Sequence, residues 1–88
     1  MSYRGEKFAL ALEMLASGLG SIQERLSNAV LSNNLLFLDS YFPEDDLREE
    51  YMDLKDGLEA NIEKMSSSEA SELISRIVSM YCEICKRD

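Results

Sequence analysis

Apolar residues that recur every three or four positions constrain this chain most. The first stripe consists of Phe8, Leu12, Leu15, Leu19, Ile22, Leu26 and Ala29. The second consists of Leu47, Tyr51, Leu54, Leu58, Ile62 and Met65, and the last of Ala70, Leu73, Ile74, Ile77, Tyr81 and Ile84. This spacing places each stripe on one face of an α-helix. No segment alternates with a period of two, so the sequence predicts an all-α fold.

Capping residues divide the stripes into separate helices. Gly18 suits the position after a helix end, and Ser21 with Glu24 forms a capping box that starts a new helix. The unbroken stripe across these residues leaves one kinked helix over 6–38 as an alternative. Pro43 indicates the start of a third helix, and Ser66 with Glu69 forms a second capping box. We expect helices near residues 6–17, 22–38, 44–64 and 67–86.

Short connections between consecutive helices favour antiparallel neighbours, so residues 1–88 are predicted to form one domain, a small antiparallel bundle of about four helices. A chain of 88 residues builds only a thin core. Several apolar residues also lie off the main stripes, and a monomer this small would struggle to cover all of them: Leu10, Met14, Leu31, Leu35 and Met52. Their exposure predicts a homodimer.

The negative charge is concentrated in one segment, Asp39 to Glu63. The chain has 17 acidic and 9 basic residues and a formal charge of −8. Ten of the acids and only two of the bases lie in this segment, so the rest of the chain balances to zero. Such a run usually covers the solvent face of a helix, but it also suits docking to a basic protein. The predicted partner-binding residues are Glu44, Asp45, Asp46, Glu49, Glu50, Asp53 and Asp56.

The same composition excludes several classes of function. A surface of this sign repels phosphate backbones and anionic lipid headgroups, so we expect no nucleic acid and no membrane as partner. The chain has no histidine, which is the usual general base near neutral pH and the commonest metal ligand. We therefore expect neither an enzyme nor a cofactor. Two cysteines do not make a disulfide framework, which favours a cytoplasmic location.

Metal and thiol chemistry were considered at two places. The residues before Gly57 do not fit a calcium loop, because Met52 and Leu54 fall where acids are required. Cys82 and Cys85 form one Cys-x-x-Cys pair, which supplies only two of the four ligands of a structural zinc site. The pair lies inside a predicted helix, where free cysteines usually behave as small buried hydrophobes. We expect buried or half-buried structural cysteines and no metal site.

Three stretches of the sequence carry a resemblance. They are Gly20 to Leu26, Phe42 to Asp45, and Met65 to Ala70 with its continuation from Arg76 to Tyr81. Together they resemble a family of short bacterial proteins of uncharacterised function. The resemblance implies a bacterial cytoplasmic origin and an all-helical fold, and it implies no activity.

The sequence thus predicts a non-enzymatic protein-protein interaction or regulatory module whose acidic helix contacts a basic protein. One alternative is an inhibitor or antitoxin that mimics the charge of nucleic acid to block a basic protein. The other alternative is a metal- or thiol-dependent protein that uses Cys82 and Cys85.

Overall fold

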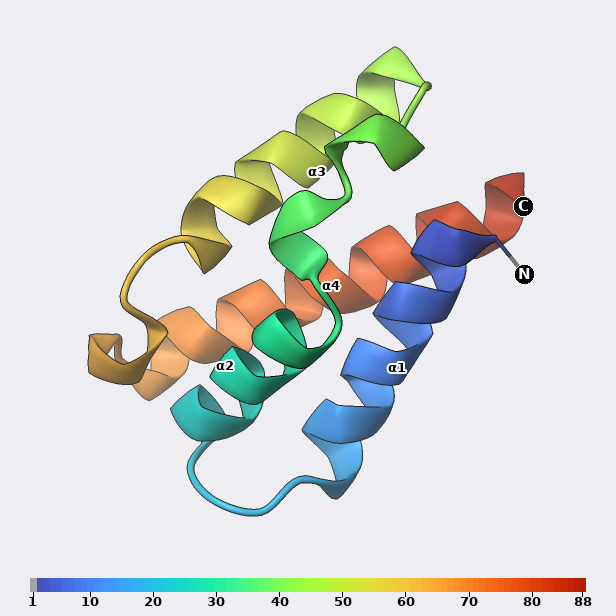
Figure 1. Ribbon diagram of the computed structural model, residues 1–88. Helices are drawn as coiled ribbons and strands as arrows, with labels where there is room; N and C mark the ends of the chain where they lie inside the picture. The colour runs from blue at the N-terminus through green and yellow to red at the C-terminus, as the bar shows by residue number, and fades with distance from the viewer. Residues whose placement is uncertain (1) are drawn as a thin grey trace.

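The computed structural model describes residues 2–88, which form four α-helices and three short 3-10 turns without a strand (Figure 1). The helices are α1 (Tyr3–Ser17), α2 (Ile22–Ser32), α3 (Asp45–Leu58) and α4 (Ser67–Arg87). The turns are η1 (Leu35–Phe37), η2 (Asp39–Tyr41) and η3 (Ile62–Lys64). The radius of gyration is 12.1 Å, as expected for a compact chain of this length. The predicted all-α bundle is confirmed.

Both predicted capping boxes start helices. The Ser21 hydroxyl accepts a hydrogen bond from the backbone N–H of Glu24 at 3.1 Å. The Ser66 hydroxyl accepts one from the backbone N–H of Glu69, also at 3.1 Å. Each bond satisfies one of the N–H groups that the first turn of a helix leaves without a partner. These local sequences therefore decide where α2 and α4 begin.

The break between α1 and α2 is confirmed, so the first stripe belongs to two helices. Gly18 follows α1, and its N–H donates to the carbonyl of Met14 at 2.8 Å. Gly20 has a φ of 101°, a conformation that favours glycine. Leu19 between them is 92% exposed. Its predicted place on the apolar stripe is wrong, because the chain leaves the helix before reaching it.

The second helix is shorter than predicted, since α2 ends at Ser32 and not near residue 38. Asn34 adopts a left-handed conformation with a φ of 54°, which a helix cannot continue through. The side-chain amide of buried Asn33 donates to the carbonyl of Ala29 at 2.8 Å and so occupies an acceptor at the helix end. The turns η1 and η2 follow and fold Leu35 into the core. Leu35 is thus an off-stripe residue that the monomer does cover, whereas Leu10, Leu31 and Met52 stay exposed.

The third helix is shorter than predicted at both ends. It begins at Asp45, with Glu44 as its N-cap residue, so Pro43 precedes the helix instead of opening it. It ends at Leu58 and not near residue 64. The chain must reverse there to bring α4 back against α3, and the turn η3 buries Ile62 during that reversal. A continuous helix would carry Ile62 away from α2, against which η3 packs.

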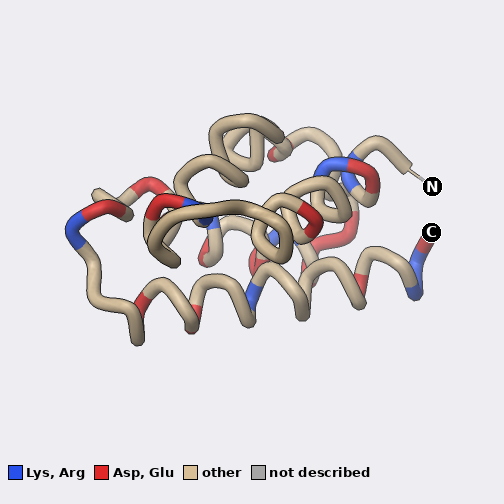
Figure 2. The backbone as a smooth tube through the Cα atoms, turned by 90° about the horizontal axis from the view of Figure 1, so that it is seen from below, with Lys and Arg blue, Asp and Glu red and all other residues tan. Residues whose placement is uncertain are grey.

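One continuous core joins the elements, and α4 runs along one side of it (Figure 2). This helix contacts α1, α2 and α3, while α3 also packs against η1 and η2 (Figure 1). The fully buried members include Phe8, Leu26, Phe42, Leu47, Tyr51, Ile77 and Ile84. Met80, which the predicted stripe of α4 omitted, is buried as well. The start of α1 and the end of α4 lie side by side in both views (Figures 1 and 2).

Tyr51 fixes the irregular segment between α2 and α3 to the core. Its hydroxyl donates to the carbonyl of Leu35 at 2.6 Å and accepts from the N–H of Leu38 at 3.0 Å. Burial, chiefly, raises the pKa of Tyr51 to about 12, so its hydroxyl keeps its proton. The Tyr51 ring also stacks on Phe42, with centroids 4.6 Å apart. The segment therefore has a fixed path despite its lack of long helices.

Candidate functional site

The structure divides the seven predicted partner-binding acids into two groups. Glu44, Asp45 and Asp46 are paired with cations of the same chain. Glu49, Glu50, Asp53 and Asp56 are exposed, and no ion pair or side-chain hydrogen bond joins them to another residue in the range 2–88. The sequence treated these acids as one surface. Only the second group keeps its charge free of such partners.

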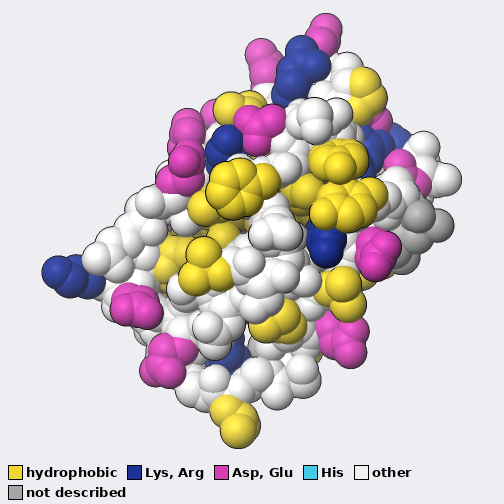
Figure 3. All heavy atoms as spheres, viewed as in Figure 1, with side chains coloured by type: hydrophobic (Ala, Val, Ile, Leu, Met, Phe, Trp, Pro, Cys, Tyr) yellow, Lys and Arg dark blue, Asp and Glu magenta, His cyan; other side chains and the backbone are white. Residues whose placement is uncertain are grey.

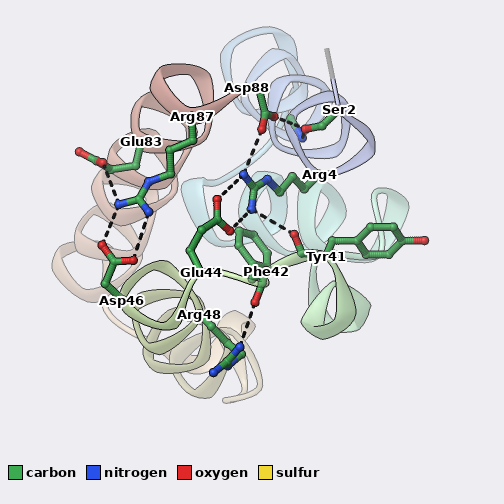
Figure 4. Close-up of polar contacts among 11 residues, drawn as sticks. Ser2, Arg4, Tyr41, Phe42, Glu44, Asp46, Arg48, Glu83, Arg87 and Asp88 are labelled. Carbon is green, nitrogen blue, oxygen red and sulfur yellow. Dashed lines mark hydrogen bonds and ion pairs between the residues drawn. The ribbon is translucent and has the colours of Figure 1, made fainter.

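The most elaborate pairing surrounds Arg4 of α1, which is 6% exposed (Figure 4). Its guanidinium donates to both carboxylate oxygens of Glu44, at 2.7 and 2.8 Å. It also donates to Asp88 Oδ1 at 3.0 Å and to the carbonyl of Tyr41 at 3.1 Å. The Ser2 hydroxyl donates to the other oxygen of Asp88. One side chain thus joins the first helix, the approach to α3 and the end of α4.

An aromatic ring supports this cluster from the core side. The Arg4 guanidinium lies 5.2 Å from the centroid of the Phe42 ring, an arrangement in which the ring quadrupole attracts the cation. Phe42 is itself stacked on Tyr51. The ion cluster is therefore continuous with the aromatic part of the core, which explains why these charges can lie so near apolar side chains.

Three further pairs involve the acidic segment. Arg87 in the last turn of α4 donates to both oxygens of Asp46, at 3.1 and 2.8 Å. Arg48 pairs with Asp45 at 2.6 Å within the first turns of α3. Lys55 donates to both oxygens of Asp39 at 3.0 Å. These pairs neutralise the N-terminal part of the acidic segment.

The pairing shifts the pKa of the acids involved. The pKa of Glu44 falls from 4.5 to about 2, and the main reason is its hydrogen bonds from Arg4. The hydrogen bond from Arg87 likewise lowers the pKa of Asp46. The hydrogen bond from Ser2, followed by the one from Arg4, lowers the pKa of Asp88. All three carboxylates are thus held in their charged form.

The four remaining acids, Glu49, Glu50, Asp53 and Asp56, form a surface that we call the acidic α3 face. Glu49 and Asp53 flank Met52, which is 38% exposed, in a shallow hollow that Arg48 also lines. Glu50 lines a different hollow, together with Arg76 of α4. The face is therefore acidic overall, with Met52 and Arg48 at one edge and Arg76 of α4 beside Glu50 at the other.

A groove lies beyond the C-terminal end of this face, between α2 and the segment that leads to α4. Its volume is about 370 Å³. The lining consists of Ser27, Val30, Leu31, Leu36, Leu58, Glu59, Ala60, Asn61, Ile62 and Glu63. Apart from Glu59 and Glu63 none of these residues is charged. The sequence did not single out this groove, because its walls come together only when η3 folds back against α2.

Cys82 and Cys85 are both free and exposed on α4, so their predicted burial is wrong. The stripe that faces the core passes through Met80 and Ile84 instead, and the two cysteines lie outside it. Among residues 2–88, no three side chains of the types that bind metals are grouped as a metal ion would require. None of the helices described here combines the length and the apolarity that crossing a membrane requires.

No protein-family model matches the chain, and neither the curated proteins nor the solved structures contain a match to it. The resemblance to a family of short bacterial proteins therefore stays a prediction. The arguments for function rest on the residues of this chain alone.

Replacing Arg4 by methionine should destabilise the fold. The variant keeps most of the apolar stem but leaves Glu44 and Asp88 without their shared cation. We expect a loss of about 2 kcal/mol in the free energy of unfolding, since hydrogen bonds to charged groups typically contribute about 1.5–3 kcal/mol. For a domain of this size that corresponds to a fall in melting temperature on the order of 10 °C. Thermal unfolding followed by circular dichroism measures it. Lys64→Met, which removes an exposed cation, is the control, and equal melting temperatures for both variants would contradict the assigned role.

Acid should weaken the fold through Glu44. Its pKa is about 2 in the folded chain and 4.5 when unperturbed, so the unfolded chain takes up the proton first as pH falls. Stability is present above pH 4.5 and is lost as pH falls towards 2. Urea unfolding at a series of pH values should show this slope, and Glu44→Gln should reduce it. A slope that is identical in both proteins would show that Arg4 does not hold Glu44 in its charged form.

Proposed function

We propose that this chain is a non-enzymatic module that binds a basic protein through the acidic α3 face. The observation that carries the proposal is the division of the acids. Internal cations neutralise Glu44, Asp45 and Asp46, whereas the four acids of the face remain exposed without an ion pair among the described residues. Folding thus leaves four unpaired acids close together on one side of α3.

The physical basis of such binding is electrostatic complementarity. Opposite surface potentials raise the rate of association and oppose the approach of wrong partners. Surface charges are screened over about 8 Å at physiological ionic strength, so the interaction weakens with added salt. Met52, partly exposed beside Glu49 and Asp53, offers an apolar contact at the edge of the charged surface.

We also propose a cytoplasmic location and a homodimer. Two free, exposed thiols suit a reducing compartment. The dimer contact would use four exposed apolar side chains, Tyr3, Leu10, Phe37 and Tyr41, each 39–75% exposed, which we call the apolar patch. Apolar side chains gather on the face formed by α1, α2 and the turns that follow (Figure 3). The rings of Tyr3 and Tyr41 are 4.7 Å apart, so part of this patch is already ordered.

Light scattering on the purified chain tests the homodimer. We expect a mass of two chains, and Phe37→Ser should shift the equilibrium towards one chain because Phe37 is the most exposed member of the patch. Leu19→Ser, which alters an exposed leucine outside the patch, should leave the mass unchanged. A mass of one chain for the unaltered protein at high concentration would contradict the dimer.

Charge reversal tests the acidic α3 face. Changing Glu49, Glu50 and Asp53 to lysine should strongly reduce the capture of partner proteins from a lysate of the organism that encodes the chain. The reason is that the field that attracts a basic surface changes sign. Captured proteins are identified by mass spectrometry, and their isoelectric points are compared with those of the whole lysate.

The control for that experiment carries the same change in net charge elsewhere. Glu6, Glu13 and Glu72 are exposed and lie outside α3, so their reversal to lysine gives a protein of equal formal charge. We expect this control to capture the same partners as the unaltered chain. Equal capture by both triple variants would refute a role for the acidic α3 face.

A further inference from the structure

The groove between α2 and η3 has an apolar wall that the fold leaves exposed. Leu31 is 67% exposed, half-buried Leu36 and exposed Ala60 also line the groove, and the buried residues Val30, Leu58 and Ile62 close it on the core side. Leucine in such a position retains most of its contact with water, which is unfavourable by about 25 cal/mol for each Å² of apolar surface. The groove therefore gains free energy from any occupant that brings apolar side chains.

The rim of the groove is acidic. Glu59 and Glu63 line it, both are exposed, and neither has an ion pair among residues 2–88. Asp56 lies one turn before Glu59 and belongs to the acidic α3 face, so the negative surface extends along the helix to the groove. Lys64 follows Glu63 in the same turn. The segment 56–64 thus carries three acids and one base.

We propose that this groove receives the apolar face of a basic amphipathic helix from a partner protein. The inference rests on the proposed function and names the surface and the element through which the basic partner is recognised. Apolar side chains of the helix enter between Leu31 and Ile62, and lysine or arginine side chains on its flanks meet Glu59 and Glu63. This is the helix-in-groove mode of recognition.

Charge decides between this occupant and a second copy of the chain. A second copy carries a formal charge of −8, which the acidic rim would repel. Electrostatic interaction therefore favours a basic helix in the groove and opposes a second copy of the chain. An extended peptide is also less suitable. Residues 2–88 contain no strand, and such a peptide would find no sheet edge to extend.

A synthetic peptide provides the probe. It has about 18 residues, roughly five helical turns, with leucines on one face and lysines on the other. A control peptide has serine in place of each leucine and the same charge. Fluorescence anisotropy measures binding to the full chain. We expect the leucine peptide to bind and the serine peptide to bind at least about tenfold more weakly, since serine removes the apolar surface that the leucines would bury. Absence of binding by the leucine peptide, or equal binding by both peptides, overturns the proposal.

Substitutions in the groove locate the contact. Ser27→Trp fills the groove from α2, and Leu31→Gln removes its most exposed apolar wall. Each should weaken binding of the leucine peptide about tenfold. Leu19→Gln is the matched control because Leu19 is exposed and does not line the groove. Circular dichroism verifies that all three variants are folded. Unchanged binding in both groove variants overturns the proposal. If one of the two variants does not fold, the other still tests the groove.

The rim acids provide a separate measurement. The double variant Glu59→Gln with Glu63→Gln should weaken binding several-fold and should reduce its dependence on salt, because two charges opposite the peptide lysines are lost. Glu13→Gln with Glu72→Gln is the control of equal charge. If the control weakens binding as much as the rim variant does, the acidic rim has no specific role. A basic helix is then not the occupant of the groove.

The proposed function and this inference fail in distinguishable ways. If reversal of Glu49, Glu50 and Asp53 abolishes binding of the leucine peptide while Ser27→Trp and Leu31→Gln do not affect it, the acidic α3 face stands and the groove is refuted. If the groove variants alone weaken binding, the groove stands and the acidic α3 face is not the contact.

Discussion

Packing of the other three helices onto α4 is the interaction on which the rest of this structure depends. A chain of 88 residues has little apolar surface to spare, and α4 is the element that contacts α1, α2 and α3. Its inward stripe, from Ala70 to Ile84, is buried almost throughout. Because α4 is the last helix along the chain, the core is completed only when its N-terminal half meets α2 and its C-terminal half meets α1 (Figure 1).

That arrangement determines where the charges go. With the end of α4 beside the start of α1, Arg4 and Arg87 come within reach of the acids that begin α3. The excess of negative charge is therefore not spread along the acidic segment. Its N-terminal part is tied into the fold, and its middle and C-terminal parts face outward, on the acidic α3 face and then around the groove.

The two proposed contact surfaces are neighbours that differ in chemistry. The acidic α3 face is polar and has one apolar side chain, Met52, at its edge. The groove has an apolar wall with two acids at its rim. Together they would supply a basic partner with long-range attraction and with a place to bury apolar side chains. The first term chiefly affects the rate of association, and the second chiefly affects how long the complex lasts.

The sequence by itself determined the elements that depend on near neighbours. Apolar periodicity identified four helices, and the hydroxyls of Ser21 and Ser66 located two of their starts, because a cap and its N–H partner are only three residues apart. Local patterns also placed Tyr51 and Leu54 in the core. They failed where a residue's surroundings depend on the path of the whole chain: Leu19 fits the stripe but lies in an exposed connection, and Cys82 and Cys85 lie on the exposed side of α4.

Only the tertiary structure decided which charges are paired and where a groove opens. Arg4 meets Glu44 and Asp88, which are 40 and 84 residues away along the chain, and no local pattern connects them. The groove likewise needs α2 and η3 to meet across a separation of about thirty residues. The sequence shows the net negative charge of the acidic segment. Which of its carboxylates stay unpaired depends on their distances from the guanidinium groups in the folded chain.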